Sequence, residues 1–184
     1  MLKTTGIIVL GAGLCTLAAF AEQPAAPQPD AGSRVGVYDS RAIAIAFVGS
    51  ELYHATDGKQ LAEMMAEYDK AKAEGNQKRM AELEAWGEAH QELLHKQGFS
   101  TAPVDGILEH IADQLPKIKE QAGVDGIVSK WDTEALAKLQ ATEQVDITML
   151  LVEAFKPTDQ QKKWAIEAQK HDPVPLEKME GHKH

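Results

Sequence analysis

The sequence predicts an α+β fold, mostly helical overall, in which a small β-sheet or barrel-like body carries a long, projecting antiparallel helical hairpin. Valines alternate with other residues over 34–39, which is typical of a short strand. The next comparable run, 124–131, comes some eighty-five residues later. In between, apolar residues recur every three or four positions, so a helical hairpin of about 40–122 is expected between two neighbouring strands.

The body is expected to hold three strands. Strand 34–39 pairs with 124–131, a third strand covers 134–140, and residues 141–146 are interpreted as a loop. So small a body buries little apolar surface alone, and we expect it to oligomerise. The residues expected to build the oligomeric body are Val35, Val37, Ile127, Val128, Ile147 and Leu151.

The hairpin is predicted from its turn and its two apolar stripes. The first helix follows Ser40 as N-cap and ends at Glu74, with a possible interruption near 56–58; Gly75 and Asn76 form the turn before a helix over 77–97. Two matching seams suit a two-helix coiled coil. They consist of Leu61, Met65 and Tyr68 on one helix and Met80, Leu83, Trp86, His90 and Leu94 on the other.

Further helices follow the hairpin. One spans 104–121, is kinked by Pro116 and ends at Gly123. Asp146 is the expected N-cap of a short apolar helix, and an amphipathic helix covers 158–170. Residues 171–184 are interpreted as a tail, so 157–184 is a C-terminal helix and tail beyond a domain of 34–156.

The N-terminus has the pattern of a signal peptide over residues 1–21. Lys3 precedes an apolar run, and Ala19-Phe20-Ala21 is a small-x-small cleavage site. An uncleaved anchor and a lipoprotein at Cys15 are the alternatives, although Leu14 is a poor residue before a lipid-bearing cysteine. Cleavage would remove the one cysteine, and with it thiol catalysis and disulfides. The Pro-rich stretch 22–33 is expected to be a disordered spacer.

Composition and motifs argue against several function classes. The formal charge of −9 disfavours nucleic acid as a main partner. Glu92 and His95 form a single Glu-x-x-His, whereas di-iron bundles need two. No phosphate-binding loop or nucleophile arrangement is recognisable after residue 21. We therefore expect no enzyme activity, no metal site and no cofactor.

The hairpin tip is a candidate binding surface. Lys70, Lys72, Lys78 and Arg79 flank it, and they could contact acidic clients or lipid headgroups. The alternative, which the sequence favours, is an ordinary solvated turn, with lysines favoured near a helix C-terminus. Met64 lies beside the apolar stripe and is the candidate client-facing residue, because methionine adapts to varied apolar partners.

Three stretches carry a resemblance to a known family. They are "RVGVYDSRAI", "ILEHIADQLPKIKEQAGVDGIVSKW" and "QVDITMLLVEAF", which match in order and approximate spacing over residues 34–156. In these stretches the chain resembles the Skp/OmpH family of periplasmic chaperones. The resemblance implies a homotrimer whose strands form a central body, with three hairpins around a cavity that holds unfolded outer-membrane proteins without ATP. The signal peptide agrees with a periplasmic location.

Two functions are therefore expected from the sequence. The first is an ATP-independent periplasmic holdase for unfolded outer-membrane or envelope proteins. The alternative is a structural or adaptor protein of the cell envelope, whose hairpin binds one specific partner or the membrane surface. The acidic balance and the additional C-terminal helix favour the alternative.

Overall fold

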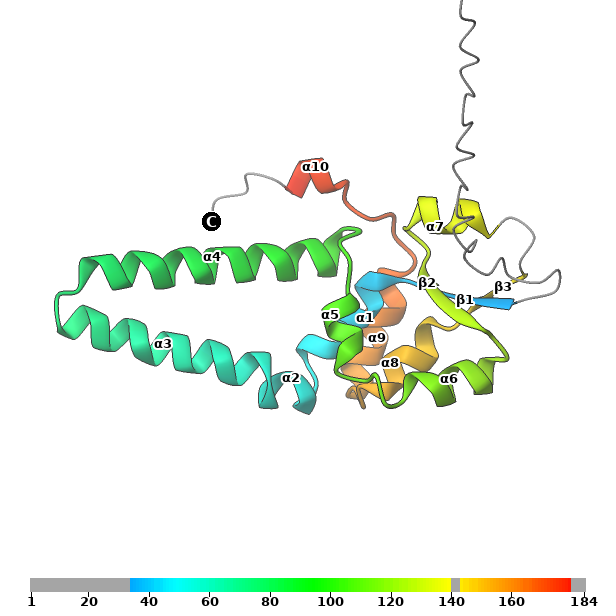
Figure 1. The fold of residues 1–184 in the computed structure, drawn as a ribbon, viewed down its shortest axis with the longest axis horizontal. Helices are drawn as coiled ribbons and strands as arrows, with labels where there is room; N and C mark the ends of the chain where they lie inside the picture. Colours follow the sequence, from blue (N-terminus) through cyan, green and yellow to red (C-terminus); the bar gives the residue numbers. More distant parts are fainter. Residues whose placement is uncertain (1–33, 140–142, 180–184) are drawn as a thin grey trace, which may run out of the picture.

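The computed structural model describes residues 34–139 and 143–179, and the expected signal peptide and spacer lie outside these ranges. The described part is mostly helical with one small sheet (Figure 1). Its elements are β1 (Arg34–Tyr38), α1 (Ser40–Val48), α2 (Glu51–Ala55), α3 (Asp57–Ala73), α4 (Gln77–Phe99), α5 (Asp105–Glu109), α6 (Leu115–Ala122), β2 (Gly126–Ser129), α7 (Thr133–Lys138), β3 (Glu143–Asp146), α8 (Thr148–Ala154), α9 (Asp159–Ala168) and α10 (Leu176–Met179).

The three strands form an open parallel sheet in the order β2-β1-β3. Val35 pairs with Gly126 on one side of β1, and Gly36 pairs with Val145 on the other. The first strand thus finds both its neighbours beyond residue 123, as the sequence predicted. Parallel pairing explains the long connection, since parallel strands need a crossover rather than a tight turn.

The third strand was predicted in the wrong place. Residues 134–138 belong to helix α7, where the Asp132 carboxylate accepts a hydrogen bond from Ala135 N at 2.9 Å. Their Ala, Leu, Lys and Glu content favours a helix over the alternating pattern. The strand is β3, in the segment interpreted as a loop, where Glu143, Gln144 and Asp146 are exposed. An exposed, charged edge strand lacks the apolar alternation by which strands are recognised.

The predicted long helices are divided. The helix expected over 40–74 is α1, α2 and α3. The break at Thr56 lies where an interruption was expected, the break at Gly49–Ser50 was not expected, and the N-cap is Asp39 rather than Ser40. The helix expected over 104–121 is α5 and α6. Pro116 lies in the first turn of α6, where its missing N–H costs nothing, so it does not kink a longer helix.

The two faces of the sheet differ. Tyr38 and Ile127 point into the main core, and Ile147 packs against Gly36 on the same side. Val35, Val37 and Val128 point to the opposite face, as the strand alternation requires. The main core is built on α1, whose Ala42, Ile43, Ala46 and Phe47 are fully buried.

The described C-terminal residues contact the rest of the chain as far as Val174. Helix α9 begins with a capping box between Thr158 and Gln161, and its Ala165 is fully buried. Beyond α9, Val174 N donates a hydrogen bond to Phe99 O at 2.9 Å, which ties the segment to the end of α4. The capping box, the buried Ala165 and this backbone hydrogen bond hold the chain here although its sequence has no long apolar period.

Replacing Gly36 with valine should destabilise the fold. A Cβ at this position would lie 2.6 Å from Ile147 Cδ1, and the Ile147 side chain is buried and has little room to move away. We expect a loss of about 1–3 kcal/mol in the free energy of unfolding, as for other overpacked cores. Urea denaturation measures it, with Gly98→Ala as control, since an added Cβ there meets no atom within 4 Å. An equal loss in both variants would contradict the packing described.

Candidate functional site

Helices α3 and α4 run side by side in opposite directions and extend away from the sheet (Figure 1). The turn between them uses Gly75, with φ +68°, and Asn76, whose side chain caps α4 by accepting from Arg79 N at 3.1 Å. Ala71 and Leu83 are buried close to this turn. The pair is therefore closely packed at its far end.

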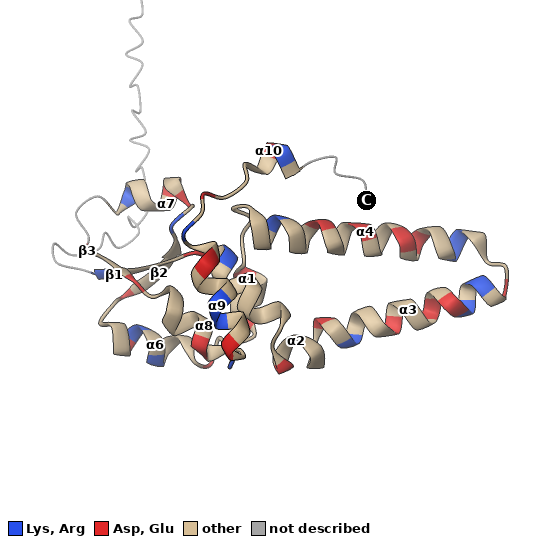
Figure 2. Cartoon of the chain, turned by 180° about the vertical axis from the view of Figure 1, so that it is seen from behind, with Lys and Arg blue, Asp and Glu red and all other residues tan. Residues whose placement is uncertain are grey.

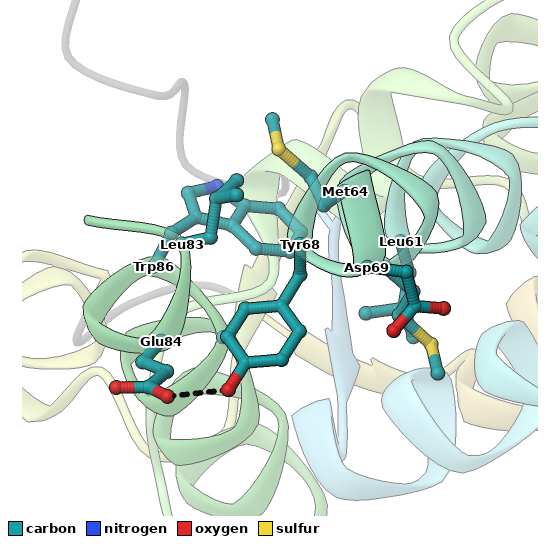
Figure 3. A pocket seen from close by; sticks show the side chains of 9 residues that line it. Leu61, Met64, Tyr68, Asp69, Leu83, Glu84 and Trp86 are labelled. Atoms are coloured by element: carbon teal, nitrogen blue, oxygen red, sulfur yellow. Dashed lines mark hydrogen bonds between the residues drawn. The ribbon is translucent and has the colours of Figure 1, made fainter. Parts of the chain in front are cut away.

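Two polar contacts join the helices across the pair. Arg79 Nη2 lies 2.9 Å from a Glu67 carboxylate oxygen, and Arg79 Nη1 lies 2.9 Å from Glu82 on its own helix. The Tyr68 hydroxyl donates to Glu84 Oε1 at 2.7 Å (Figure 3). The hydrogen bond from Arg79 lowers the pKa of Glu67, and the bond to Glu84 raises the pKa of Tyr68. These exposed contacts join the two helices in the register that the structure shows.

An apolar groove of about 270 Å³ lies between the two helices (Figure 3). The predicted stripes supply much of its lining, and Met64 lies at its edge. Met65 remains 63% exposed, so the groove is open to solvent. The residues that line the groove are Leu61, Met64, Met65, Tyr68, Asp69, Leu83, Glu84, Trp86 and Gly87.

Towards the body the groove is continued by an aromatic pair. The rings of Trp86 and His90 are stacked 5.1 Å apart, with an angle of 8° between them. The Nε2 atom of His90 is buried and makes no hydrogen bond to another described residue. Such an atom lacks the partner that a buried ring nitrogen normally has.

The four predicted cations at the turn are not equivalent. Figure 2 shows basic segments of both helices next to the turn. Lys70, Lys72 and Lys78 are exposed, and none of them forms an ion pair with another described residue. Arg79 is neutralised by its two glutamates. The basic surface at the turn is therefore provided by the three lysines, and Arg79 links the helices instead.

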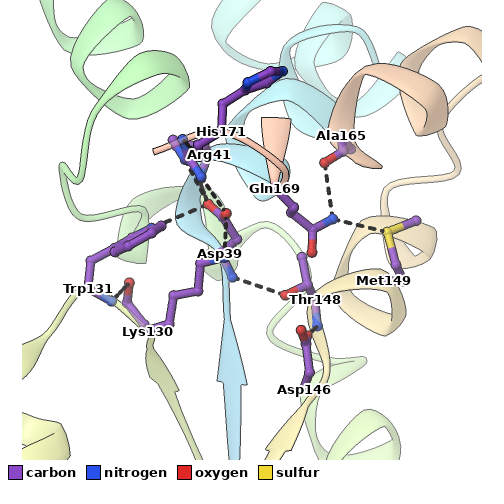
Figure 4. A network of polar contacts seen from close by, with 11 residues as sticks. Asp39, Arg41, Lys130, Trp131, Asp146, Thr148, Met149, Ala165, Gln169 and His171 are labelled. Carbon is purple, nitrogen blue, oxygen red and sulfur yellow. Dashed lines mark hydrogen bonds and ion pairs between the residues drawn. The ribbon is translucent and has the colours of Figure 1, made fainter. Parts of the chain in front are cut away.

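A second polar centre lies at the carboxyl end of the sheet, and the sequence analysis missed it (Figure 4). The fully buried Asp39 carboxylate lies 2.8 Å from Arg41 Nη2 and 2.7 Å from Lys130 Nζ. It also accepts from Trp131 Nε1 at 3.3 Å. The sequence did contain a signal for this centre. An aspartate directly follows the first strand, and a lysine and a tryptophan directly follow the second, so parallel pairing would bring them together.

This network joins distant parts of the chain. Asp39 N donates to Thr148 Oγ1 at 3.0 Å, and Arg41 Nη1 donates to the His171 carbonyl at 2.9 Å. Burial by itself would raise the pKa of Asp39, but hydrogen bonds from Arg41 and Lys130 outweigh it and hold the pKa below its ordinary value. Hydrogen-bond donors surround the carboxylate. It therefore links these segments of the chain and is poorly placed to accept a proton as a general base.

The expected oligomer residues fall into two groups. Val37 and Val128 are partly exposed on the sheet face away from the core, beside the buried Val35. Ile127 lines the core face, while Ile147 and Leu151 are almost completely buried inside the chain. Of the six, only Val37 and Val128 lie where a second copy could contact the sheet.

Neither a metal site nor a membrane-spanning helix is found in the described ranges. No group of three or more His, Cys, Asp or Glu side chains there is arranged to hold a metal ion. No helix among those residues combines the length and the apolar character needed to cross a bilayer.

The chain matches no protein-family model, no curated protein and no solved structure.

Replacing Asp39 with asparagine should destabilise the protein by about 3–5 kcal/mol at neutral pH, because it leaves buried cations without their counter-charge. The pKa of Asp39 is lower in the folded protein than in the unfolded chain, where it is about 4, so the ionised carboxylate stabilises the fold at pH values above 4. This stabilisation is lost as the pH falls through the pKa of the folded state. The difference in stability between wild type and variant should therefore shrink in acid. Urea unfolding from pH 7 to pH 3 tests this, with Asp113→Asn at an exposed position as control. A difference that does not change with pH would contradict the ionised network.

Proposed function

We propose that the protein is an ATP-independent holdase of the periplasm, which binds unfolded outer-membrane or envelope proteins as a homotrimer. The observation that carries the proposal is the open apolar groove between α3 and α4. In this proposal the two helices are a projecting hairpin of the Skp/OmpH type, and the groove is where an unfolded chain is held.

The lining of the groove suits varied clients. Met64 and Met65 bring flexible, polarisable side chains to its edge, and Tyr68 and Trp86 add aromatic surface. Methionine-rich surfaces repack around different apolar partners, which supports promiscuous rather than specific binding. Two carboxylates complete its lining, and one of them already accepts a hydrogen bond from the Tyr68 hydroxyl.

The lysines at the turn add a second, electrostatic contact. Lys70, Lys72 and Lys78 are exposed and form no ion pair with a described residue. They would attract acidic stretches of a client or the headgroups of an anionic membrane. Their contribution should weaken with salt, since exposed charges are screened within about 10 Å at 0.1 M.

The sheet supports contact between copies. Val37 and Val128 expose apolar surface on the face away from the core, and the edge strands β2 and β3 are short. A three-stranded sheet gains stability when its free face is covered. In the proposed trimer this face forms the shared body, so that the three hairpins project around a common space.

An adaptor of the cell envelope is the alternative function. The formal charge of −9 and the carboxylates of Asp69 and Glu84 in the groove favour a single partner that complements them. Such a protein would bind one ligand tightly and would not suppress the aggregation of unrelated unfolded proteins. Client range therefore separates the two functions.

Replacing Met65 with glutamate should weaken the binding of unfolded client proteins. The side chain is 63% exposed, so the change removes apolar contact and adds charge without disturbing the core. We expect half-maximal suppression of aggregation to need about five- to tenfold more protein, equivalent to about 1 kcal/mol. The assay dilutes a urea-unfolded outer-membrane barrel protein without ATP and follows light scattering.

A matched control is Ile166→Glu on α9, which adds the same charge at a side chain 44% exposed and away from the groove. It should hold clients as the wild type does. An equal loss of aggregation suppression in both variants would show that clients are not bound in the groove. A folded wild type that suppresses no aggregation would favour the adaptor.

Replacing Val37 with aspartate should dissociate the proposed trimer into monomers. The new carboxylate would lie on the proposed shared face, beside Asp146 of the neighbouring strand. Sedimentation velocity should show monomers, whereas Gln60→Asp, at an exposed position on α3, should leave the trimer intact. A trimer that survives Val37→Asp would place the contact between copies elsewhere.

A further inference from the structure

A second hollow lies between the core face of the sheet and α5, away from the α3–α4 groove. It has a volume of about 300 Å³ and is lined by Tyr38, Asp105, Leu108, Glu109, Ala112, Leu115 and Ile127. Four of these side chains are apolar and form its walls. Its size is near the lower end of the range for small-molecule sites.

The polar groups of this hollow lack partners. Tyr38 is only 5% exposed, and its hydroxyl makes no hydrogen bond to another described residue, although it lines the hollow. Asp105 and Glu109 lie one helical turn apart on α5, and neither forms an ion pair within the described part of the chain. The hydroxyl is not among the buried polar atoms that lack a partner, so it is accessible from the hollow, where a bound group can reach it.

The charges around the hydroxyl determine the sign of that ligand. Burial, and then the negative charges of Asp105 and Asp132, raise the pKa of Tyr38 to about 12. The phenol therefore stays protonated, and the surroundings favour a positive group. A cation that enters the hollow would neutralise the carboxylates at its rim while an apolar stem contacts Leu108 and Leu115.

We propose that this hollow binds an organic cation, an ammonium or guanidinium group on an apolar stem. The rim carboxylates of Asp105 and Glu109 bind the cation, the Tyr38 ring and hydroxyl orient it, and the apolar walls hold the stem. This site is separate from the α3–α4 groove and does not depend on the holdase function. The cation can be a free alkylamine or the side chain of lysine in a polypeptide.

The test is a titration of the folded, isotope-labelled protein followed by NMR chemical shifts of the residues that line the hollow. The probes are cadaverine, a capped pentapeptide with one lysine, and 1,5-pentanediol as the uncharged analogue of cadaverine. Saturable shifts with a dissociation constant near or below about 1 mM are expected for a cationic probe and not for the diol. Saturation by cadaverine alone identifies a free amine, whereas saturation by the peptide identifies a side chain.

Two variants separate binding from folding. Glu109→Gln changes an exposed side chain and should weaken cadaverine binding at least about fivefold, since it removes one of the two rim charges. Tyr38→Phe keeps the ring and removes only the hydroxyl, so it should weaken binding less. Absence of shifts with both cations up to about 20 mM, equal shifts with the diol, or unchanged binding to Glu109→Gln would overturn the proposal.

Discussion

The fold depends on one buried carboxylate. Asp39 lies where β1 ends and α1 begins, and it binds Arg41 from the helix and Lys130 from the end of β2. Its backbone N–H reaches Thr148 at the start of α8, and Arg41 extends the network to the C-terminal segment. A buried charge is tolerated only when it is paired, so the burial of Asp39 requires that these segments come together. The sheet is thereby fixed as the base from which α3 and α4 extend.

The buried network at the base contrasts with the open surface of the α3–α4 pair. Near the turn the pair is held by Arg79 and by the buried Leu83, whereas the groove leaves Met65 largely exposed. The buried Nε2 of His90 has no protein partner in the described residues. An apolar surface left open on a well-ordered scaffold is typical of sites that bind other molecules. The charge of the three free lysines lies beyond it, at the turn.

Local signals in the sequence predicted the parts of the fold that short-range physics controls. The Gly75–Asn76 turn and the left-handed Gly123 are where the sequence predicted them, since few residues adopt these conformations or caps. Strand β3 was missed because an exposed edge strand carries no apolar alternation. Helix α7 was predicted as a strand because a short run of Ala and Leu fits the helical period as well as the strand period. The Asp39 network was missed because its members are some ninety residues apart and meet only in the folded sheet. The groove was not predicted, because the sequence indicated two matching apolar seams and only the structure leaves Met65 largely exposed. The role of Arg79 was not predicted either, because only the structure places Glu67 beside it.

The central claim is that unfolded polypeptide is held in the α3–α4 groove, and site-specific photo-crosslinking tests it most directly. A photoreactive residue placed at Met64 should crosslink to a urea-unfolded outer-membrane barrel protein upon dilution, because this side chain borders the groove. The same residue placed at Trp164, which is 56% exposed on α9, should not. Crosslinking at Met64 and not at Trp164 is the result that the account predicts. Equal crosslinking at both positions, or none at Met64 in a folded protein that still suppresses aggregation, would contradict it.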